Sequence, residues 1–184
     1  MKIIGITGTL GAGKGTIVEY LVEKKDFIHY SVRQFLTEEI QRQQLPLNRD
    51  SMVLVANNLR KQHHPSYIID ALYQQAEKVN KNAIIESIRT PAEVISLRSK
   101  SDFYLLAVDA DPQIRYNRIV ERNSETDHVT FEEFLSNEQR EMQNDDVNKQ
   151  NLKQCIAMAD YVLNNDKTIA DLHKNIELIL ANID

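Results

Sequence analysis

The sequence predicts a three-layer α/β fold, in which a five-stranded parallel sheet carries helices on both faces. Short, nearly continuously apolar segments alternate along the chain with longer amphipathic stretches. Strands buried on both faces have such apolar segments, and their alternation with helices indicates a parallel sheet. A length of 184 residues fits one compact domain. The five predicted strands span residues 2–7, 27–31, 83–88, 103–109 and 161–163.

The segments between these strands have the starts and the apolar stripes of helices. Thr90 and Glu93 match a capping box, and Pro91 stands at the first helical position. Residues 169–183 repeat apolar side chains on one stripe, which predicts a helix packed on the sheet. Further helix starts are marked by Asp111, Thr130 and Thr168.

Composition and charge narrow the classes of function. The 22 basic and 27 acidic residues give a net charge of −5, which argues against binding of nucleic acid or of an anionic membrane through a basic face. Cys155 is the only cysteine, so we expect neither an intramolecular disulfide nor a cysteine-rich zinc site. No stretch approaches the roughly 18 apolar residues of a membrane span, and the N-terminal apolar run is too short for a signal peptide. We therefore expect a cytoplasmic protein.

The first predicted strand runs into a glycine-rich motif at residues 8–16, which reads G-x-x-x-x-G-K-G-T. Glycines let the backbone wrap around phosphate oxygens, and the helix that follows presents the positive end of its dipole to them. Lys14 is expected to reach the β- and γ-phosphates of ATP, and Thr16 to bind Mg²⁺. Strand, loop and helix follow in the required order, so this is the P-loop pattern. The residues predicted to hold the phosphates are Gly11, Ala12, Gly13, Lys14, Gly15 and Thr16.

The G-K-G-T form of this motif, with the length and the strand count, resembles adenylate kinase and the related P-loop nucleoside monophosphate kinases. The strings ESIRTPAEV and ADYVLNND are most similar to dephospho-coenzyme A kinase-like proteins and to the P-loop domain attached to some deoxycytidylate deaminases. The resemblance covers nearly the whole chain and implies a single P-loop kinase domain over residues 1–184. It also implies an acceptor-binding helical segment at residues 32–81 and a short mobile lid at residues 123–130.

Glu86 and Arg89 stand at the end of the third predicted strand, where the family has an Asp-Gly pair followed closely by an arginine. The resemblance implies that Glu86 helps to hold Mg²⁺ and that Arg89 holds the acceptor phosphate, since an arginine fork matches phosphate oxygens. Glu86 and Ser87 replace the family's Asp and Gly, and the extra methylene of Glu86 moves its carboxylate. An ion pair between Arg89 and Glu93 on the next helix is the alternative.

Arg115, Arg118 and Arg122 follow the fourth predicted strand at helical spacing, so they share one helix face. The resemblance implies that Arg118 stacks on adenine and that Arg122 touches the phosphates, whereas Arg115 fits a solvated basic face. The helix expected at residues 130–144 carries Arg140. By the same resemblance, Arg140 closes over the transferred phosphoryl group.

Further residues complete the two ends of the expected site. Ser31 follows the second predicted strand, where the family supplies a hydroxyl to the acceptor monophosphate. Arg33 would replace an arginine that the family carries a few residues further on, and Arg60 lies in the helical segment assigned to the acceptor. Asn165 belongs to the turn after the fifth strand, where the family's loop meets adenine through its backbone.

Together these residues imply Mg²⁺-dependent transfer of the γ-phosphoryl group of ATP to a small nucleotide, a nucleoside or deoxynucleoside monophosphate. Catalysis would rest on positioning and on neutralisation of charge by Lys14, Mg²⁺, Arg122 and Arg140. Dephospho-coenzyme A kinase is one alternative; its hydroxyl acceptor needs a general base at the strand end, conventionally an Asp, for which Glu86 is an imperfect substitute. A nucleotide-binding regulatory module without turnover is the other alternative, because the family's Asp-Gly pair and acceptor arginine are altered here.

Overall fold

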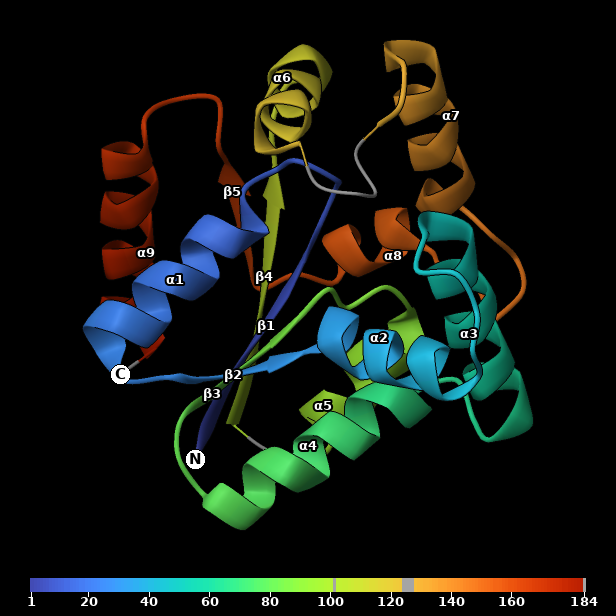
Figure 1. Ribbon diagram of the computed structural model, residues 1–184. Coiled ribbons are helices and arrows are strands. Elements are labelled where there is room, and N and C mark those ends of the chain that lie inside the picture. The colour runs from blue at the N-terminus through green and yellow to red at the C-terminus, as the bar shows by residue number, and fades with distance from the viewer. Residues whose placement is uncertain (101, 124–127, 184) are drawn as a thin grey trace.

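Parallel strands form the centre of the computed structural model, which describes residues 1–100, 102–123 and 128–183. Within these residues the sheet has five strands in the order β2-β3-β1-β4-β5, so the predicted sheet is confirmed (Figure 1). The largest difference from the prediction is at the end of β3, which stops at Glu86 because Ser87 has a left-handed backbone with φ of 65°. The strands are β1 (Lys2–Gly8), β2 (Ile28–Ser31), β3 (Ala83–Glu86), β4 (Asp102–Asp109) and β5 (Tyr161–Asn164).

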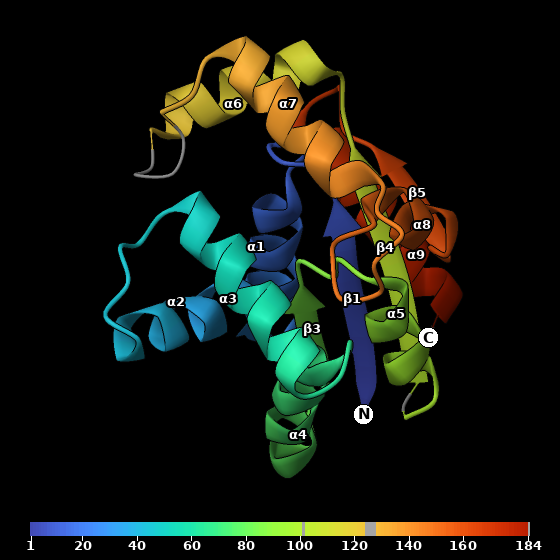
Figure 2. The ribbon, with the colours of Figure 1, turned by 90° about the vertical axis from the view of Figure 1, so that its right-hand side faces the viewer.

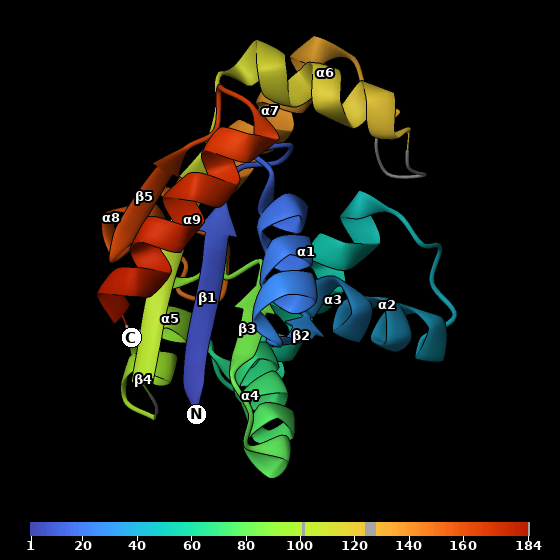
Figure 3. The same cartoon turned by 90° about the vertical axis from the view of Figure 1, so that its left-hand side faces the viewer.

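Helices cover both faces of this sheet (Figures 1 and 3). One face carries α1 (Lys14–Lys25) and α9 (Ile169–Ile183), and the other carries the helices that follow β2 and β3 together with α8. The arrangement is the predicted three-layer α/β fold. The remaining helices are α2 (Val32–Arg42), α3 (Arg49–Gln62), α4 (Tyr67–Val79), α5 (Pro91–Arg98), α6 (Pro112–Arg122), α7 (Phe131–Met142) and α8 (Leu152–Ala157).

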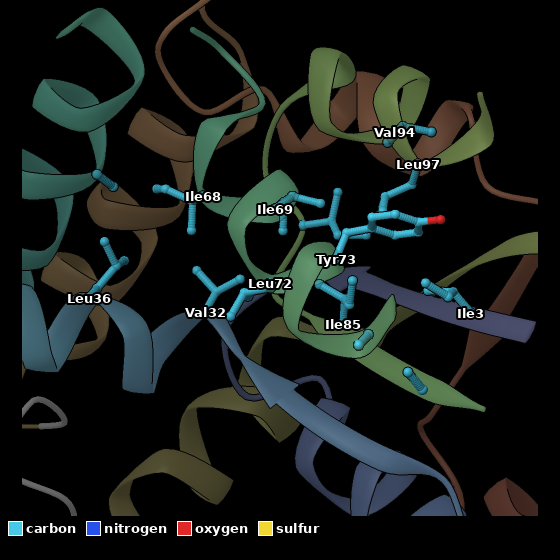
Figure 4. Packing of buried hydrophobic residues seen from close by; sticks show 14 of the residues in the cluster. Ile3, Val32, Leu36, Ile68, Ile69, Leu72, Tyr73, Ile85, Val94 and Leu97 are labelled. Carbon is cyan, nitrogen blue, oxygen red and sulfur yellow. The ribbon is translucent and has the colours of Figure 1, made fainter. Parts of the chain in front are cut away.

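The core consists of two apolar clusters, one on each side of the sheet. Neighbouring residues of β1 serve opposite sides, because successive side chains of a strand alternate: Ile3 belongs to one cluster and Ile4 to the other. Figure 4 shows the cluster of Ile3, in which Leu72 of α4 and Leu97 of α5 pack toward the sheet. Every strand is thus anchored by apolar contacts, which leaves the strand ends to carry polar side chains.

The helix starts confirm the capping signals of the sequence. Thr90 accepts a hydrogen bond from the amide of Glu93 at 3.3 Å, and the Glu93 carboxylate accepts one from the amide of Thr90 at 3.0 Å. Thr130 forms the same box with Glu133 at the start of α7. Asp111 caps α6 by accepting from the amides of its first turn. These caps fix where α5, α6 and α7 begin relative to the strands before them.

The carboxyl ends of the strands lie beneath α6 and α7, which arch over this edge of the sheet (Figure 2). The helices α2, α3 and α4 occupy the segment 32–81 that was assigned to the acceptor. Residues 124–127 of the predicted lid at 123–130 lie outside the described residues. In the described part of the chain, no helix is both long and apolar enough to cross a membrane.

Candidate active site

A cleft of about 930 Å³ opens at the carboxyl ends of β1, β2 and β3. Its walls are the P-loop and α1 on one side, α2 and α3 on another, and α6 and α7 above. Ligand pockets in proteins are commonly about 300–1,000 Å³, so the cleft has the size of a substrate site. The position is the one at which open parallel sheets bind ligands. The site residues predicted from the sequence that line it are Gly11, Gly13, Lys14, Gly15, Thr16, Ser31, Arg33, Arg60, Glu86, Arg89, Arg118, Arg122 and Asn165.

The P-loop is shaped as a cradle that the protein itself does not fill. Gly13 has a left-handed backbone with φ of 104°, and a Cβ there would lie 2.3 Å from Nδ2 of Asn165. A Cβ at Gly15 would meet no described protein atom within 4 Å. The helix α1 begins at Lys14, so its positive end faces this space. The loop therefore fits the phosphates of a bound nucleotide.

The side chain of Lys14 folds back onto the P-loop. Its Nζ donates hydrogen bonds to the carbonyl oxygens of Gly8 at 2.9 Å and Thr9 at 2.7 Å. Burial and the nearby charge of Arg89 lower the pKa of the Lys14 ammonium to about 7, and the carboxylates of Glu86 and Glu141 offset part of this shift. A lysine with this pKa changes its charge near neutral pH, and a phosphate beside it would favour the charged form.

Glu86 presents a carboxylate at the end of β3. Ser31 lies opposite it on β2 and donates to Oε1 at 3.3 Å, while Ser87 donates to Oε2 at 2.5 Å. His29 lines the cleft nearby, where burial lowers its pKa and the charge of Glu86 acts in the opposite direction. Both carboxylate oxygens are therefore held in place, and Glu86 faces the same cleft as Thr16.

Mg²⁺ fits this donor set as an ion bound largely by the nucleotide. The hydroxyl of Thr16 and the carboxylate of Glu86 are the oxygen donors that a hard cation prefers. Within the described residues no group of three or more His, Cys, Asp or Glu side chains could hold a metal by itself. Thr16 and Glu86 would therefore act together with phosphate oxygens, as Mg²⁺ sites of phosphoryl-transfer proteins do.

The nucleotide end of the cleft joins α6 to the P-loop. Nη2 of Arg118 donates to the backbone oxygen of Asn165 at 2.8 Å, and Nδ2 of Asn165 donates to the backbone oxygen of Ala12 at 2.8 Å. Nη1 of Arg118 is buried and has no hydrogen-bond partner among the described atoms. The structure thus brings Arg118 and Asn165 together beside the loop.

The opposite end of the cleft is rich in arginine. Arg33 of α2, Arg49 and Arg60 of α3, and Arg89 after β3 all line it. Glu141 of α7 reaches two of them: Nη1 of Arg89 donates to Oε2 at 2.7 Å, and Nη2 of Arg49 donates to Oε1. Burial raises the pKa of the Glu141 carboxyl, but Arg89 and Arg49 outweigh burial and hold the pKa below its ordinary value.

Two expectations about arginine pairing need correction. The Arg89 side chain pairs with Glu141, so the alternative of an ion pair with Glu93 is wrong; it is the backbone amide of Arg89 that donates to Glu93, at 2.8 Å. Glu93 instead pairs with Arg60, whose Nη2 lies 2.9 Å from Oε1, and both side chains are almost fully buried. Arg60 therefore borders the cleft with its charge already neutralised by a neighbour, unlike the acceptor contact that was expected.

Two further arginines lie elsewhere than expected. Arg115 is only 2% exposed, donates to the backbone oxygen of Ala110 at 2.7 Å and pairs with Glu138 of α7, so its placement on a solvated face is wrong. Arg140 has 60% of its side chain exposed and donates to Asn137 at 2.6 Å. It is not among the described residues that line the cleft, because the helix turns Glu141 inward in its place.

Sequence reasoning missed His29, Arg49, Glu141 and Gln150, which also line the cleft. Helical spacing could have found two of them. Glu141 stands seven residues after the buried Phe134 and so shares its helix face. Arg49 heads a stripe along α3 that lines the cleft at helical spacing. The stripe consists of Arg49, Met52, Val53, Ala56 and Arg60.

Comparisons with known proteins agree with this geometry. A UPF0200 protein of Methanococcus maripaludis strain C7 is 32% identical over 186 residues, which cover 100% of this chain and 98% of that one. Among solved structures, a gluconokinase from Sinorhizobium meliloti 1021 has a TM-score of 0.62 at 12% identity, with coverage of 99% and 93%. A shikimate kinase from Bacteroides thetaiotaomicron has a TM-score of 0.59 at 12% identity, with 98% of each chain covered.

The two solved structures show that the fold is that of P-loop kinases. Neither they nor the Methanococcus protein is named as a nucleoside monophosphate kinase or a dephospho-coenzyme A kinase, so that narrower resemblance stays a prediction. Residues 4–144, well over half of the chain, match the AAA domain family. The chain therefore belongs to the AAA domain family and, by its match along the whole Methanococcus chain, to the UPF0200 proteins.

Proposed function

We propose that this protein transfers the γ-phosphoryl group of ATP to the phosphate of a nucleoside or deoxynucleoside monophosphate. The observation that carries the proposal is the division of one cleft into a P-loop end, which contains Lys14, and an arginine-rich end, which contains Arg89. A phosphate at each end would bring donor and acceptor together over Lys14. Positioning and charge neutralisation supply most of the catalysis of phosphoryl transfer.

The P-loop end is assigned to ATP. Its phosphates lie over residues 11–16, where the amides at the start of α1 and the Lys14 ammonium neutralise their charge. Arg118 packs against the adenine, and its unpartnered Nη1 offers one more donor there. Thr16 and Glu86 would hold Mg²⁺ together with the nucleotide, and the ion would supply further neutralisation of charge on the transferred group.

The arginine-rich end is assigned to the acceptor. An oxygen of the acceptor phosphate forms a bond to the γ-phosphorus, while the bond from that phosphorus to the bridging oxygen of ADP breaks. The products are ADP and a nucleoside diphosphate. Arg89 and Arg49 hold the acceptor phosphate through their forks, and Arg122 neutralises charge that grows on the transferred group. The apolar side chains of α2 and α3 that line the cleft supply a surface for the base. They are Val32, Leu36, Met52, Val53 and Ala56.

A hydroxyl acceptor, as in dephospho-coenzyme A kinase, is the second candidate, and the placement of Glu86 in the cleft favours it. In that reaction the hydroxyl oxygen attacks the γ-phosphorus, its proton passes to the Glu86 carboxylate, and ADP leaves. Ser31 and Ser87 already donate to this carboxylate, so Glu86 must give up one of these hydrogen bonds before it can accept the proton of a hydroxyl. Two donors on the base therefore make this candidate the weaker one.

A panel of acceptors separates these functions. ADP formation would be measured with MgATP and each nucleoside and deoxynucleoside monophosphate, dephospho-coenzyme A, gluconate or shikimate, with Lys14→Ala as the control variant. We expect turnover with at least one monophosphate and none in Lys14→Ala. Turnover with hydroxyl acceptors alone would replace the proposal by the second candidate. ATP binding without turnover on any acceptor would favour a regulatory module.

A further inference from the structure

Glu141 places a carboxylate between two arginines of the acceptor end. Each of its oxygens has an arginine of its own: Oε1 accepts from Arg49 and Oε2 from Arg89, at 2.7 Å for the second pair. The oxygen of Gln150 lies 3.4 Å from the same Nη1 of Arg89. All of these residues line the cleft. A phosphate monoester binds paired arginines in the same manner, with a different terminal oxygen on each fork.

The carboxylate leaves part of this arginine pair unused. Nε of Arg49 is buried and has no hydrogen-bond partner among the described atoms. A guanidinium offers five N–H donors in a fixed fork, and one carboxylate divided between two forks meets few of them. It also sets one negative charge against two positive charges. A dianionic phosphate with three terminal oxygens would satisfy more donors and balance both charges.

Glu141 reaches the arginines from a separate element of the fold. Arg49 is the first residue of α3 and Arg89 follows β3, whereas Glu141 belongs to the last turn of α7. The Glu141 side chain is only 10% exposed, so its carboxylate is largely shielded from water where it meets the arginines. A phosphate that binds both forks must displace this carboxylate and so break the ion pair that joins α7 to α3.

We propose that Glu141 is an internal competitor for the acceptor phosphate, whose carboxylate occupies Arg49 and Arg89 until a phosphate monoester displaces it. The identity of that ligand rests on the proposed function. Glu141 then makes the site specific for phosphorylated acceptors, because a neutral molecule cannot replace a carboxylate between two guanidinium groups. It also weakens acceptor binding and promotes release of the phosphorylated product.

Inorganic phosphate, titrated by calorimetry into the protein whose P-loop is saturated with a non-hydrolysable ATP analogue, tests the competition directly. Glu141→Gln keeps the size of the side chain and removes its charge, so we expect about tenfold tighter phosphate binding, the effect of one charged hydrogen bond. Glu138→Gln is the matched control, since Glu138 lies one turn earlier on α7 and pairs with Arg115 outside the cleft. It should leave phosphate affinity unchanged. Equal or weaker phosphate binding by Glu141→Gln would overturn the inference and make Glu141 a residue that merely positions the arginines.

Two further variants keep the test decisive. Glu141→Asp retains the charge but is too short to bridge both arginines, so it should also bind phosphate more tightly than the wild type, whereas a positioning role predicts weaker binding. Adding Arg49→Gln to Glu141→Gln should remove the gain. Tighter phosphate binding by a protein that phosphorylates no monophosphate would sustain the inference and refute the proposed function. Turnover on a monophosphate by the wild type, together with an unchanged phosphate affinity in Glu141→Gln, would sustain the proposed function and refute the inference.

Discussion

The pKa of Lys14 leads to a quantitative prediction for ATP binding. With a pKa of about 7, Lys14 is mostly charged at about pH 6 and only about one tenth charged at about pH 8. Phosphates beside the ammonium favour its charged form and raise its pKa in the complex. ATP affinity should therefore be constant well below pH 7 and fall as the pH rises through 7. Between about pH 6 and pH 8 the fall should be about tenfold, with uptake of nearly one proton per ATP at the higher pH.

Calorimetry with a non-hydrolysable ATP analogue measures both quantities. Titrations in two buffers of different ionisation enthalpy give the number of protons taken up, and titrations across the pH range give the affinity. Lys14→Met is the control, because it removes the titrating group and leaves the protonation of the analogue itself. Subtracting its pH profile isolates the contribution of Lys14.

Two results would refute this reasoning. One is a wild-type affinity whose pH profile is parallel to that of Lys14→Met. The other is proton uptake near zero at about pH 8, which would mean that Lys14 stays charged in the free protein. Either result would show that burial and Arg89 perturb Lys14 much less than the arrangement of the loop implies.

Four substitutions test the arginines. Arg89→Lys keeps the charge but loses the fork, so kcat/KM for the acceptor should fall roughly 10- to 100-fold, or about 1.5–3 kcal/mol. The KM for ATP should stay unchanged, and a loss confined to ATP would refute the assignment of Arg89 to the acceptor. Arg118→Ala should mainly raise the KM for ATP and Arg122→Ala should mainly lower kcat, and identical effects on kcat alone would contradict these roles. Arg60→Met leaves the buried carboxylate of Glu93 unpaired and should reduce the free energy of unfolding in urea by about 3–5 kcal/mol, and a change near zero would contradict the buried ion pair.

The sequence was sufficient for the sheet and the P-loop because these features are local. Each apolar run of β1 to β5 and each cap at Thr90 or Thr130 has its signal within a few residues. The glycine motif likewise carries its own geometry, since Gly13 needs a left-handed backbone wherever the chain goes next. The parallel order of the strands then places Ser31 beside Glu86, a pairing that no local signal of the sequence predicted.

The arginines could not be placed in the same way. Burial of a lone charge is unfavourable, so an arginine without a visible partner is expected at the surface. Arg60 and Arg115 are buried because Glu93 and Glu138 meet them from other elements, and these pairs are separated by 33 and 23 residues. Which face of α7 turns toward the cleft also depends on tertiary packing. Arg140 was therefore expected at the cleft, where the structure places Glu141 instead.

The transfer itself is the most direct test of the central claim. ATP carrying a radioactive γ-phosphate would be incubated with the monophosphate that gives the fastest ADP release, and the label would be followed by chromatography. The account predicts that the label appears in the nucleoside diphosphate formed from the acceptor, and that Arg89→Gln greatly slows its appearance at limiting acceptor while Lys14→Ala abolishes it. Label found only in inorganic phosphate, or in a phosphate ester of a hydroxyl acceptor, would contradict the account.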